Sequence, residues 1–183
     1  KKYPMFIKPA NAGSSVGVSK ANNRKELIDG IKKASKEDGK ILIEEGIVGK
    51  EVECAVLGNE NPISSIVGEI APSSSFYDYE AKYISDSSKL FIPARISDSI
   101  SEEIRQTALL AYKAMGCTGL SRVDFFVEEG TDKVLLNEIN TFPGFTNISM
   151  YPKLMKEIGI DFSDLIDKLI DFALQRKELN ERR

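Results

Sequence analysis

Two apolar stretches in the second half of the chain carry polar residues at alternate positions, and this pattern most constrains the fold. The stretches are GLSRVDFFVEE, which contains Arg122 and Asp124, and KVLLNEIN, which contains Glu138 and Asn140. Side chains alternate between the faces of a strand, so Arg122 and Asp124 share one face, as do Glu138 and Asn140. Neighbours on one face lie roughly 6.6 Å apart, close enough to converge on one ligand. The sequence therefore predicts two strands that present carboxylate, amide and guanidinium groups.

These polar groups have two interpretations. Their oxygens suit a hard cation such as Mg²⁺, which proteins usually hold with one or two carboxylates together with substrate phosphates. The simpler interpretation is a solvated sheet face with one ion pair, with Asn140 serving turn chemistry near a strand end. For either run alone the simpler interpretation is favoured, because salt bridges are commoner than metal sites. The following sequence Thr141-Phe142-Pro143-Gly144 and the motifs upstream shift the balance toward a metal site.

The composition is that of an ordinary globular chain and excludes several classes of protein. Of the 183 residues, 42% are hydrophobic and 29% are charged, which suits one large domain or two small ones. The net charge of −3 argues against a protein that coats nucleic acid. No apolar run reaches the roughly 18 residues that a membrane span requires. We therefore expect neither nucleic acid nor a membrane as a partner.

Histidine is absent from the sequence, and its absence limits the available chemistry. It excludes histidine-activated nucleophiles, histidine general bases and histidine-ligated zinc, iron or copper. The two cysteines, Cys54 and Cys117, form no CxxC motif and are expected to be reduced, small, buried hydrophobes. Any catalysis must therefore use carboxylates, lysine, arginine, hydroxyls, backbone amides and oxygen-ligated metal.

The order of the elements predicts an α+β fold with mixed or antiparallel sheets. Several strands are consecutive and joined by short turns, which disfavours a doubly wound parallel sheet. Helices are expected after capping-box sequences at Asn23 and Ser99, near residues 150–158, and after a cap at Asp161 or Ser163. Further strands are expected at residues 3–7, 16–19, 40–45, 51–57 and 63–70.

Apolar residues at helical spacing predict the buried face of each long helix. Glycine is the expected stop at Gly39, Gly116 and Gly159. The expected buried stripes are Leu27, Ile28, Ile31 and Ala34 in the first helix, Ile104, Ala108, Ala111, Tyr112 and Met115 in the second, and Leu165, Ile166, Leu169, Ile170 and Ala173 in the last.

Two short segments near the start of the chain have the chemistry of a nucleotide site. Residues 13–17, GSSVG, form a small-residue loop whose backbone N–H groups and hydroxyls suit phosphate oxygens, with Lys8 nearby as a point charge. The loop is neither a Walker A motif nor GxGxxG, and a plain hairpin loop is the alternative. Glu44 and Glu45 end an apolar strand, where they could accept hydrogen bonds from adenine or ribose or simply be solvated.

Residues 71–90 differ from the rest of the chain, because they are polar and aromatic without a sustained period. So long an irregular stretch in a compact domain is usually functional or disordered, and four aromatic rings argue against plain disorder. A loop that closes over a site and excludes water is one interpretation. A loop pinned by its aromatic rings against the core is the other.

Taken in order, these motifs resemble the D-alanine–D-alanine ligases, which belong to the ATP-grasp superfamily. The resemblance covers nearly the whole chain, and the run FYDYEAKY from Phe76 to Tyr83 makes it specific. It implies an ATP-grasp fold of two subdomains with the nucleotide bound between them. Residues 1–45 would be the remainder of the central subdomain, and residues 46–183 the C-terminal subdomain with its active-site loop at 71–90. The family's N-terminal domain, with an acidic residue that engages the first D-alanine, and an earlier ATP-contacting lysine would be missing. This chain is therefore expected to be a fragment that is inactive alone.

The resemblance also implies a role for individual residues at matching positions. Arg122 would be the cation over the reacting phosphate and carboxyl, and Ser14 and Tyr83 the hydrogen-bonded pair that closes the loop. Asp124, Glu138 and Asn140 would bind two Mg²⁺ ions, for which Mn²⁺ is a possible replacement, with Glu138 bridging them. The implied ATP contacts are Lys8 and Lys82 at the phosphates, Glu44, Glu45, Ile47 and Glu51 at adenine and ribose, and Phe76 against the adenine ring. The implied contacts to the second D-alanine are Gly144, Ser149 and Met150.

The implied reaction joins two D-alanines through a D-alanyl phosphate intermediate, in the cytoplasmic synthesis of peptidoglycan precursors for the cell wall. The full-length enzyme would be a homodimer. Relatives that make D-alanyl-D-lactate carry a histidine near the second substrate, so the absence of histidine and the presence of Tyr83 favour an amine. D-Serine as second substrate is an alternative. Another ATP-grasp carboxylate–amine ligase and a nucleotide-binding fragment without catalysis are two more.

Overall fold

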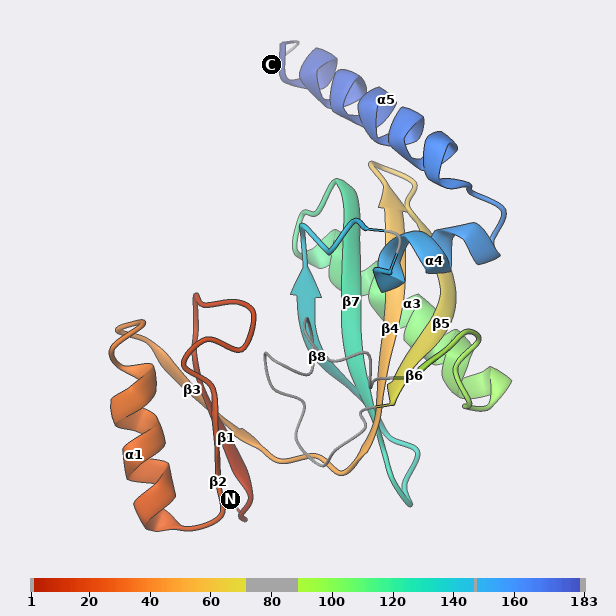
Figure 1. Ribbon diagram of the computed structural model, residues 1–183. Helices are drawn as coiled ribbons and strands as arrows, with labels where there is room; N and C mark the ends of the chain where they lie inside the picture. The colour runs from red at the N-terminus through yellow and green to blue at the C-terminus, as the bar shows by residue number, and fades with distance from the viewer. Residues whose placement is uncertain (1, 72–88, 147, 182–183) are drawn as a thin grey trace. The chain divides into compact units, whose positions relative to one another are not determined.

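The computed structural model describes residues 2–71, 89–146 and 148–181, which form two compact units (Figure 1). The first unit comprises the residues up to Val48, and the second comprises residues 49–71 and the residues from Lys89 onward. All strand pairs are antiparallel in both units. The predicted α+β class is therefore confirmed. The subdomain roles expected for residues 1–45 and 46–183 stay predictions.

The first unit is a three-stranded sheet with one helix against it. The strands are β1 (Met5–Pro9), β2 (Ser19–Ala21) and β3 (Ile41–Glu45), in the order β2-β1-β3. Strand β2 begins later than the expected 16–19, because Ser14, Ser15 and Gly17 all have positive φ, so that residues 13–17 form turns instead. Lys8, which was expected to end the first strand, lies inside β1.

Helix α1 (Arg24–Ala34) covers this sheet and begins at the predicted cap. The Asn23 side chain accepts from the backbone N–H of Glu26 at 3.0 Å, and the Glu26 carboxylate accepts from Asn23 Nδ2 at 2.7 Å. The helix ends at Ala34, five residues before Gly39. Ile28 was expected on the buried face and is 43% exposed. The buried face instead runs through Gly30, where an added Cβ would lie 2.6 Å from Ser19 Oγ, so the sheet approaches the helix backbone closely.

The second unit is a five-stranded sheet between helices (Figure 1). One face packs against α3 (Asp98–Ala114), through Ile104, Ala108 and Tyr112. The other packs against α4 (Met150–Glu157), which in turn contacts α5 (Phe162–Glu181). The strand order is β6 (Lys89–Phe91), β5 (Ile63–Ala71), β4 (Gly49–Gly58), β7 (Gly119–Glu128) and β8 (Val134–Asn140).

Helix α3 differs from its predicted bounds at both ends. It begins after Ser97, whose hydroxyl accepts from the Ile100 N–H at 3.4 Å, and not at the expected Ser99. Met115 was expected in the buried stripe and is 71% exposed, because it is the C-cap residue and the helix has already ended. Gly116 follows with φ of +64°, which confirms the predicted glycine stop.

Helices α4 and α5 also follow the predicted order. Gly159, with φ of +84°, follows α4 as expected. The first backbone bond of α5 runs from the Leu165 N–H to the Asp161 carbonyl, so Asp161 and not Ser163 is the cap position. Only Leu165 of the expected stripe of α5 is buried, and Ile166 and Ile170 are 39% and 54% exposed. The helix contacts the rest of the unit along the line of Leu165, Leu169 and Phe172, which leaves the other side in solvent.

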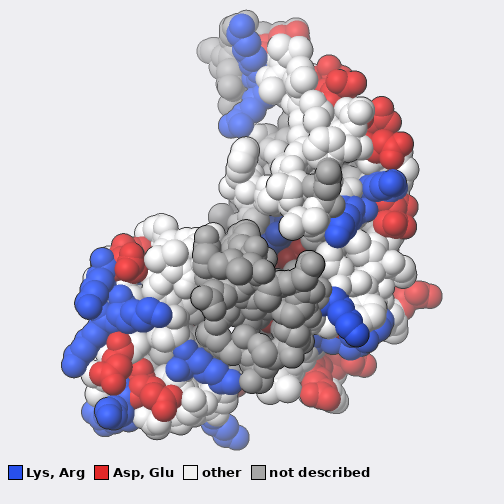
Figure 2. All heavy atoms as spheres, viewed as in Figure 1, with Lys and Arg blue, Asp and Glu red and all other residues white. Residues whose placement is uncertain are grey.

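The surface of the described residues carries both signs of charge. Figure 2 shows lysine and arginine side chains interspersed with aspartate and glutamate on this face of both units. Within the parts of the chain that the structure describes, no helix has the combined length and apolar character needed to cross a membrane.

Candidate carboxylate and arginine site

The polar residues of β7 and β8 lie side by side on one face of the second unit's sheet. Asp124 pairs with Glu138, and Arg122 pairs with Asn140. Strand β4 extends both rows, because Glu53 pairs with Asp124 and Ala55 with Arg122. Directly paired residues project to the same face of a sheet. The alternation in the sequence predicted correctly that Arg122 shares a face with Asp124 and Glu138 with Asn140, and the pairing of β7 with β8 brings the two sets together.

A β-bulge in β8 makes this convergence possible. Phe125 pairs with Leu136 while its neighbour Asp124 pairs with Glu138, so Asn137 is an extra residue. In a regular register without the bulge, Asn137 would stand opposite Asp124, and Glu138 would point toward the core under α3. The bulge shifts the alternation by one residue, so that Glu138 joins Asp124 on the site face and Ile139, paired with Val123, packs into that core.

Arg122 is held by two carboxylates. Its Nε and Nη2 donate to the two oxygens of Asp124, each at 2.7 Å, in a bidentate pair. Its Nε also lies 3.1 Å from Oε2 of Glu53. Asn140 completes the network, because its Nδ2 donates to Asp124 Oδ2 at 2.9 Å and to Glu138 Oε1 at 3.3 Å.

The cluster has more negative than positive charge. Among the described residues, Glu53, Asp124 and Glu138 act on the one guanidinium of Arg122. Burial alone would lower the pKa of Arg122, but the hydrogen bonds to Asp124 and the charges of all three carboxylates raise it above its ordinary value. The side chains of Glu53, Asp124 and Arg122 are only 7%, 14% and 21% exposed, so water screens these charges poorly. A further cation would balance the excess.

The donors match what a hard divalent cation requires. Mg²⁺ is usually held by one or two carboxylates and substrate oxygens, and Asp124, Glu138 and Asn140 supply oxygens of this kind. Among the described residues, no group of three or more acidic or cysteine side chains is arranged to hold a metal by itself. Both Asp124 oxygens are bound to Arg122, and Asn140 presents its nitrogen. Metal binding would therefore require Asp124 to exchange partners and the Asn140 amide to turn.

Three other predicted residues of the second unit lie after β8. An added Cβ on Gly144 would lie 2.9 Å from Ser149 Oγ, so the two predicted substrate contacts are neighbours. The Ser149 hydroxyl accepts from the Thr146 N–H at 3.0 Å. The Met150 side chain is 5% exposed and packs against Gly68 of β5. Any contact of Met150 with a substrate would therefore use its backbone.

The predicted residues of the first unit form a separate arrangement. Lys8 on β1 and Glu44 on β3 make an ion pair of 2.7 Å on one sheet face. Ser14 belongs to the turn after β1 and has φ of +53°, in the left-handed region that non-glycine residues rarely adopt. Glu45 ends β3 and is exposed, and Ile47 follows it. Glu51 belongs to β4 of the second unit, on the same face as Glu53. Phe76, Lys82 and Tyr83 lie outside the described residues.

Sequence reasoning missed Glu53. It is 5% exposed and lies inside the apolar run VECAVL, where a buried acid without a purpose would be costly. Its alternation with Glu51 was a usable signal. The pairing of β4 with β7 was not visible in the sequence, so nothing placed Glu53 beside Arg122.

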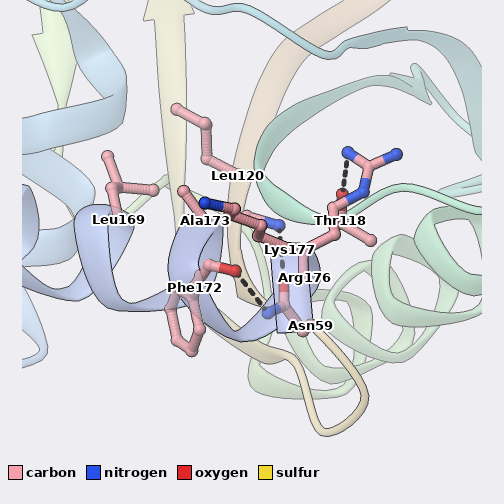
Figure 3. A pocket seen from close by; sticks show the side chains of 9 residues that line it. Asn59, Thr118, Leu120, Leu169, Phe172, Ala173, Arg176 and Lys177 are labelled. Atoms are coloured by element: carbon pink, nitrogen blue, oxygen red, sulfur yellow. Dashed lines mark hydrogen bonds between the residues drawn. The ribbon is translucent and has the colours of Figure 1, made fainter. Parts of the chain in front are cut away.

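A pocket of about 560 Å³ lies elsewhere in the second unit (Figure 3). Arg176 Nη1 donates to Thr118 Oγ1 at 2.8 Å, and Asn59 Nδ2 donates to the Phe172 carbonyl at 3.0 Å, so these contacts tie α5 to the sheet. None of the predicted site residues lines the pocket. Its lining residues are Asn59, Thr118, Gly119, Leu120, Leu169, Phe172, Ala173, Arg176 and Lys177.

Comparison with known proteins identifies similar chains. Residues 1–171 match the family model described as D-ala D-ala ligase C-terminus. The chain is 59% identical over 174 residues to the D-alanine–D-alanine ligase of Acetivibrio thermocellus. The matched region covers 95% of this chain and 46% of that protein.

Two solved structures are also similar. The VanG D-Ala:D-Ser ligase from Enterococcus faecalis has a TM-score of 0.83 and 47% identity, over 93% of this chain and 50% of that one. The D-alanine–D-alanine ligase from Bacillus anthracis complexed with ATP has a TM-score of 0.79 and 28% identity, over 98% and 56%. The chain thus spans about half the length of its relatives.

Proposed function

Because the chain belongs to the D-alanine–D-alanine ligase family, with its ATP-grasp fold, we propose that it supplies the metal and phosphoryl-transfer groups of an enzyme that joins two D-alanines with cleavage of ATP. The observation that carries this proposal is the polar sheet face, where Asp124, Glu138 and Asn140 lie beside Arg122. The Bacillus anthracis relative was solved with ATP, which supports ATP as the nucleotide.

The proposed reaction has two steps. The carboxylate of one D-alanine attacks the γ-phosphorus of ATP, which gives D-alanyl phosphate and ADP. The amine of the second D-alanine attacks the acyl carbonyl, and phosphate leaves. Phosphoryl transfer requires chiefly positioning and neutralisation of charge, which this chain offers without histidine.

Arg122 is the proposed catalytic cation. Its pKa is raised by the surrounding carboxylates, so it stays protonated throughout the physiological range. Among the described residues its contacts use Nε and Nη2, which leaves Nη1 for an oxygen of the reacting phosphate or carboxyl. A planar guanidinium suits such oxygens better than an ammonium group does.

Asp124, Glu138 and Asn140 are the proposed ligands of two Mg²⁺ ions, or of Mn²⁺, with Glu138 shared between them. Bound there, the ions would neutralise phosphate charge and orient the phosphates. The excess negative charge of the cluster supports this role, because a purely structural ion pair would need only one acid.

The remaining roles are also proposals. Lys8 would leave Glu44 to contact the ATP phosphates, and Glu44, Glu45, Ile47 and Glu51 would contact adenine and ribose. Gly144, Ser149 and Met150 would contact the second D-alanine. Phe76, Lys82 and Tyr83, together with Ser14, keep the roles that the family implies. The cytoplasmic synthesis of peptidoglycan precursors and a homodimeric full-length enzyme complete the proposal.

A second candidate is a ligase that uses D-serine as the second substrate. The VanG relative, at 47% identity, is described as a D-Ala:D-Ser ligase, which gives this candidate specific support. A nucleotide-binding fragment without catalysis is a third, because the chain spans half of its relatives.

Phosphate release from ATP tests these candidates. The chain should be assayed alone and joined to the half that its relatives carry in addition, with D-alanine, and with D-alanine plus D-serine. We expect D-alanine-dependent release only from the longer protein. Glu138→Gln should abolish release even at saturating Mg²⁺. A longer protein that releases no phosphate on addition of D-alanine, or a Glu138→Gln variant with a near-normal rate, would contradict the proposal.

A further inference from the structure

Glu53 is a buried carboxylate that the family resemblance leaves without a role. It lies on β4 directly opposite Asp124, and its side chain is 7% exposed. Its Oε2 lies 3.1 Å from Arg122 Nε. The following inward residues on this face of β4, Ala55 and Leu57, are apolar and pack under α4. Glu53 therefore lies where this face of β4 changes from acidic residues, Glu51 and Glu53, to the apolar residues under α4, and it is buried there.

Stability is a weak reason for this acid. The desolvation of a buried ion pair often cancels its attraction, and apolar replacements are commonly neutral or stabilising. Arg122 already has a complete bidentate partner in Asp124, at 2.7 Å for both bonds. A second acid on the same Nε adds negative charge where one carboxylate already balances the guanidinium. The second acid is explained if Asp124 binds another cation for part of the time and then no longer pairs fully with Arg122.

The Asp124 carboxylate has two alternative cationic partners, Arg122 and the proposed metal ion. Its oxygens bind Arg122 and accept from Asn140 in this structure, and they are also the oxygens proposed to bind a divalent cation. When Asp124 turns to a cation, the guanidinium loses at least part of its bidentate pair. A guanidinium that is only 21% exposed cannot recover that loss from water. The Arg122 guanidinium therefore requires a second anion that stays in contact with it.

We propose that Glu53 is a positioning residue, which holds the Arg122 guanidinium through Nε while Asp124 gives its oxygens to a divalent cation. The proposal rests on the proposed function, because it assumes that Asp124 is a metal ligand. Glu53 is suited to this part, because it sits across from Asp124 on the opposite neighbour of β7, away from Glu138 and Asn140. It can therefore hold Arg122 from the β4 side of β7, whereas Glu138 and Asn140 approach from β8 on the other side of that strand.

The first test is the affinity of the 183-residue chain for Mn²⁺, measured by titration with electron paramagnetic resonance. Glu53→Gln leaves Asp124 as the only carboxylate among the described residues that is in direct contact with Arg122, so Mn²⁺ must compete with a stronger pair. We expect a loss of about 10- to 100-fold in Mn²⁺ affinity, the range typical of groups that orient metal ligands. In an Arg122→Ala background, Glu53→Gln should change the affinity much less, because the competition is gone.

Glu69→Gln is the matched control. Glu69 is also a buried carboxylate paired with an arginine, Arg95, but it lies on the opposite face of the same sheet. It should weaken folding without changing Mn²⁺ affinity. Equal loss of affinity in both variants, or a Glu53→Gln effect that is unchanged in the Arg122→Ala background, would overturn the positioning role.

The second test uses the longer protein and compares kcat with KM for ATP. We expect Glu53→Gln to lower kcat by about 10- to 100-fold and to leave KM within about twofold, because Arg122 is misplaced while the nucleotide contacts remain. Combined with Arg122→Ala, it should add little further loss. If the kcat loss of the double variant equals the product of the losses of the two single variants, the role of Glu53 is refuted. A wild-type longer protein that binds Mn²⁺ but shows no D-alanine-dependent phosphate release would instead refute the proposed function, and the Mn²⁺ titration would still decide the role of Glu53.

Discussion

The pair of Glu69 and Arg95 gives the sharpest prediction about folding. Glu69 is buried on β5, and its carboxylate accepts from the backbone N–H of Arg95 at 3.0 Å, from Nε at 3.1 Å and from Nη2 at 2.5 Å. The Arg95 guanidinium also lies 3.6 Å from the centre of the Phe91 ring. Glu69→Gln keeps the shape but replaces one acceptor by a donor, so at least one hydrogen bond to the arginine is lost.

The expected loss follows from these contacts. A hydrogen bond to a charged group contributes about 1.5–3 kcal/mol. Arg95 is 53% exposed and regains water, so the larger penalty for breaking a fully buried pair does not apply. We expect Glu69→Gln to lower the free energy of unfolding by about 2 kcal/mol, or the melting temperature by about 4–8 °C. Urea unfolding followed by circular dichroism measures this, with the exposed pair of Glu102 and Arg105 as control.

Acidification tests the same reasoning. Burial alone would raise the pKa of Glu69, but the hydrogen bonds and charge of Arg95, with the charge of Lys50, hold it below its ordinary value. A carboxyl whose pKa is lower in the folded than in the unfolded state stabilises the folded protein. This contribution is fully present above the unfolded pKa of about 4.3 and is lost as the pH falls through the pKa of the folded state. The advantage of wild type over Glu69→Gln should therefore be constant from pH 7 to about pH 5.5 and shrink at lower pH. An advantage that grows on acidification, or a Glu102→Gln control that loses as much as Glu69→Gln, would refute the reasoning.

Three further predictions concern the second unit. Tyr112→Phe removes the hydrogen bond that the Tyr112 hydroxyl donates to the buried Gly58 carbonyl at 2.7 Å, and it should cost about 1–3 kcal/mol in urea unfolding. Gly49→Ala would place a Cβ 2.1 Å from the Val127 carbonyl oxygen, so a shift of paired backbone is required and a loss of at least about 2 kcal/mol is expected in the same assay. Cys54 is fully buried, and burial raises the pKa of its thiol to about 12, so in the native protein iodoacetamide should label the partly exposed Cys117 much faster; equal labelling rates would contradict this.

The sequence predicted the type and order of most elements because their signals are local, but it missed the short strand β6, which follows an irregular stretch. The cap at Asn23 and the glycine stop at Gly116 depend on neighbouring residues only, and both were found where expected. Buried faces were predicted less well. Ile28 and Ile170 have the right spacing but lie in solvent, because the contact made by each helix decides which side is covered.

For the candidate site, the sequence predicted which side chains share a face within one strand, but not which strands pair. Alternation placed Arg122 beside Asp124 and Glu138 beside Asn140, and the structure puts the two pairs together. The sequence could not show the bulge at Asn137, which decides whether Glu138 faces the site or the core. Nor could it show Glu53, because its place beside Arg122 depends on a strand that is far away in the chain.

In the described part of the second unit, two buried glutamates, Glu69 and Glu53, contact an arginine, and the two arrangements differ in their charge balance. The Glu69 carboxylate is satisfied by one residue, Arg95, including its backbone N–H, and Phe91 covers the guanidinium. The charge of this acid is balanced by Arg95, with Lys50 nearby. Arg122 instead meets Glu53 and Asp124, with Glu138 beside them, on a face that α4 covers only in part. An ion pair alone is therefore a poor sign of function in this fold. The more informative feature is the excess of buried carboxylates around one arginine among the described residues, because a bound cation would lower the electrostatic cost of such an arrangement.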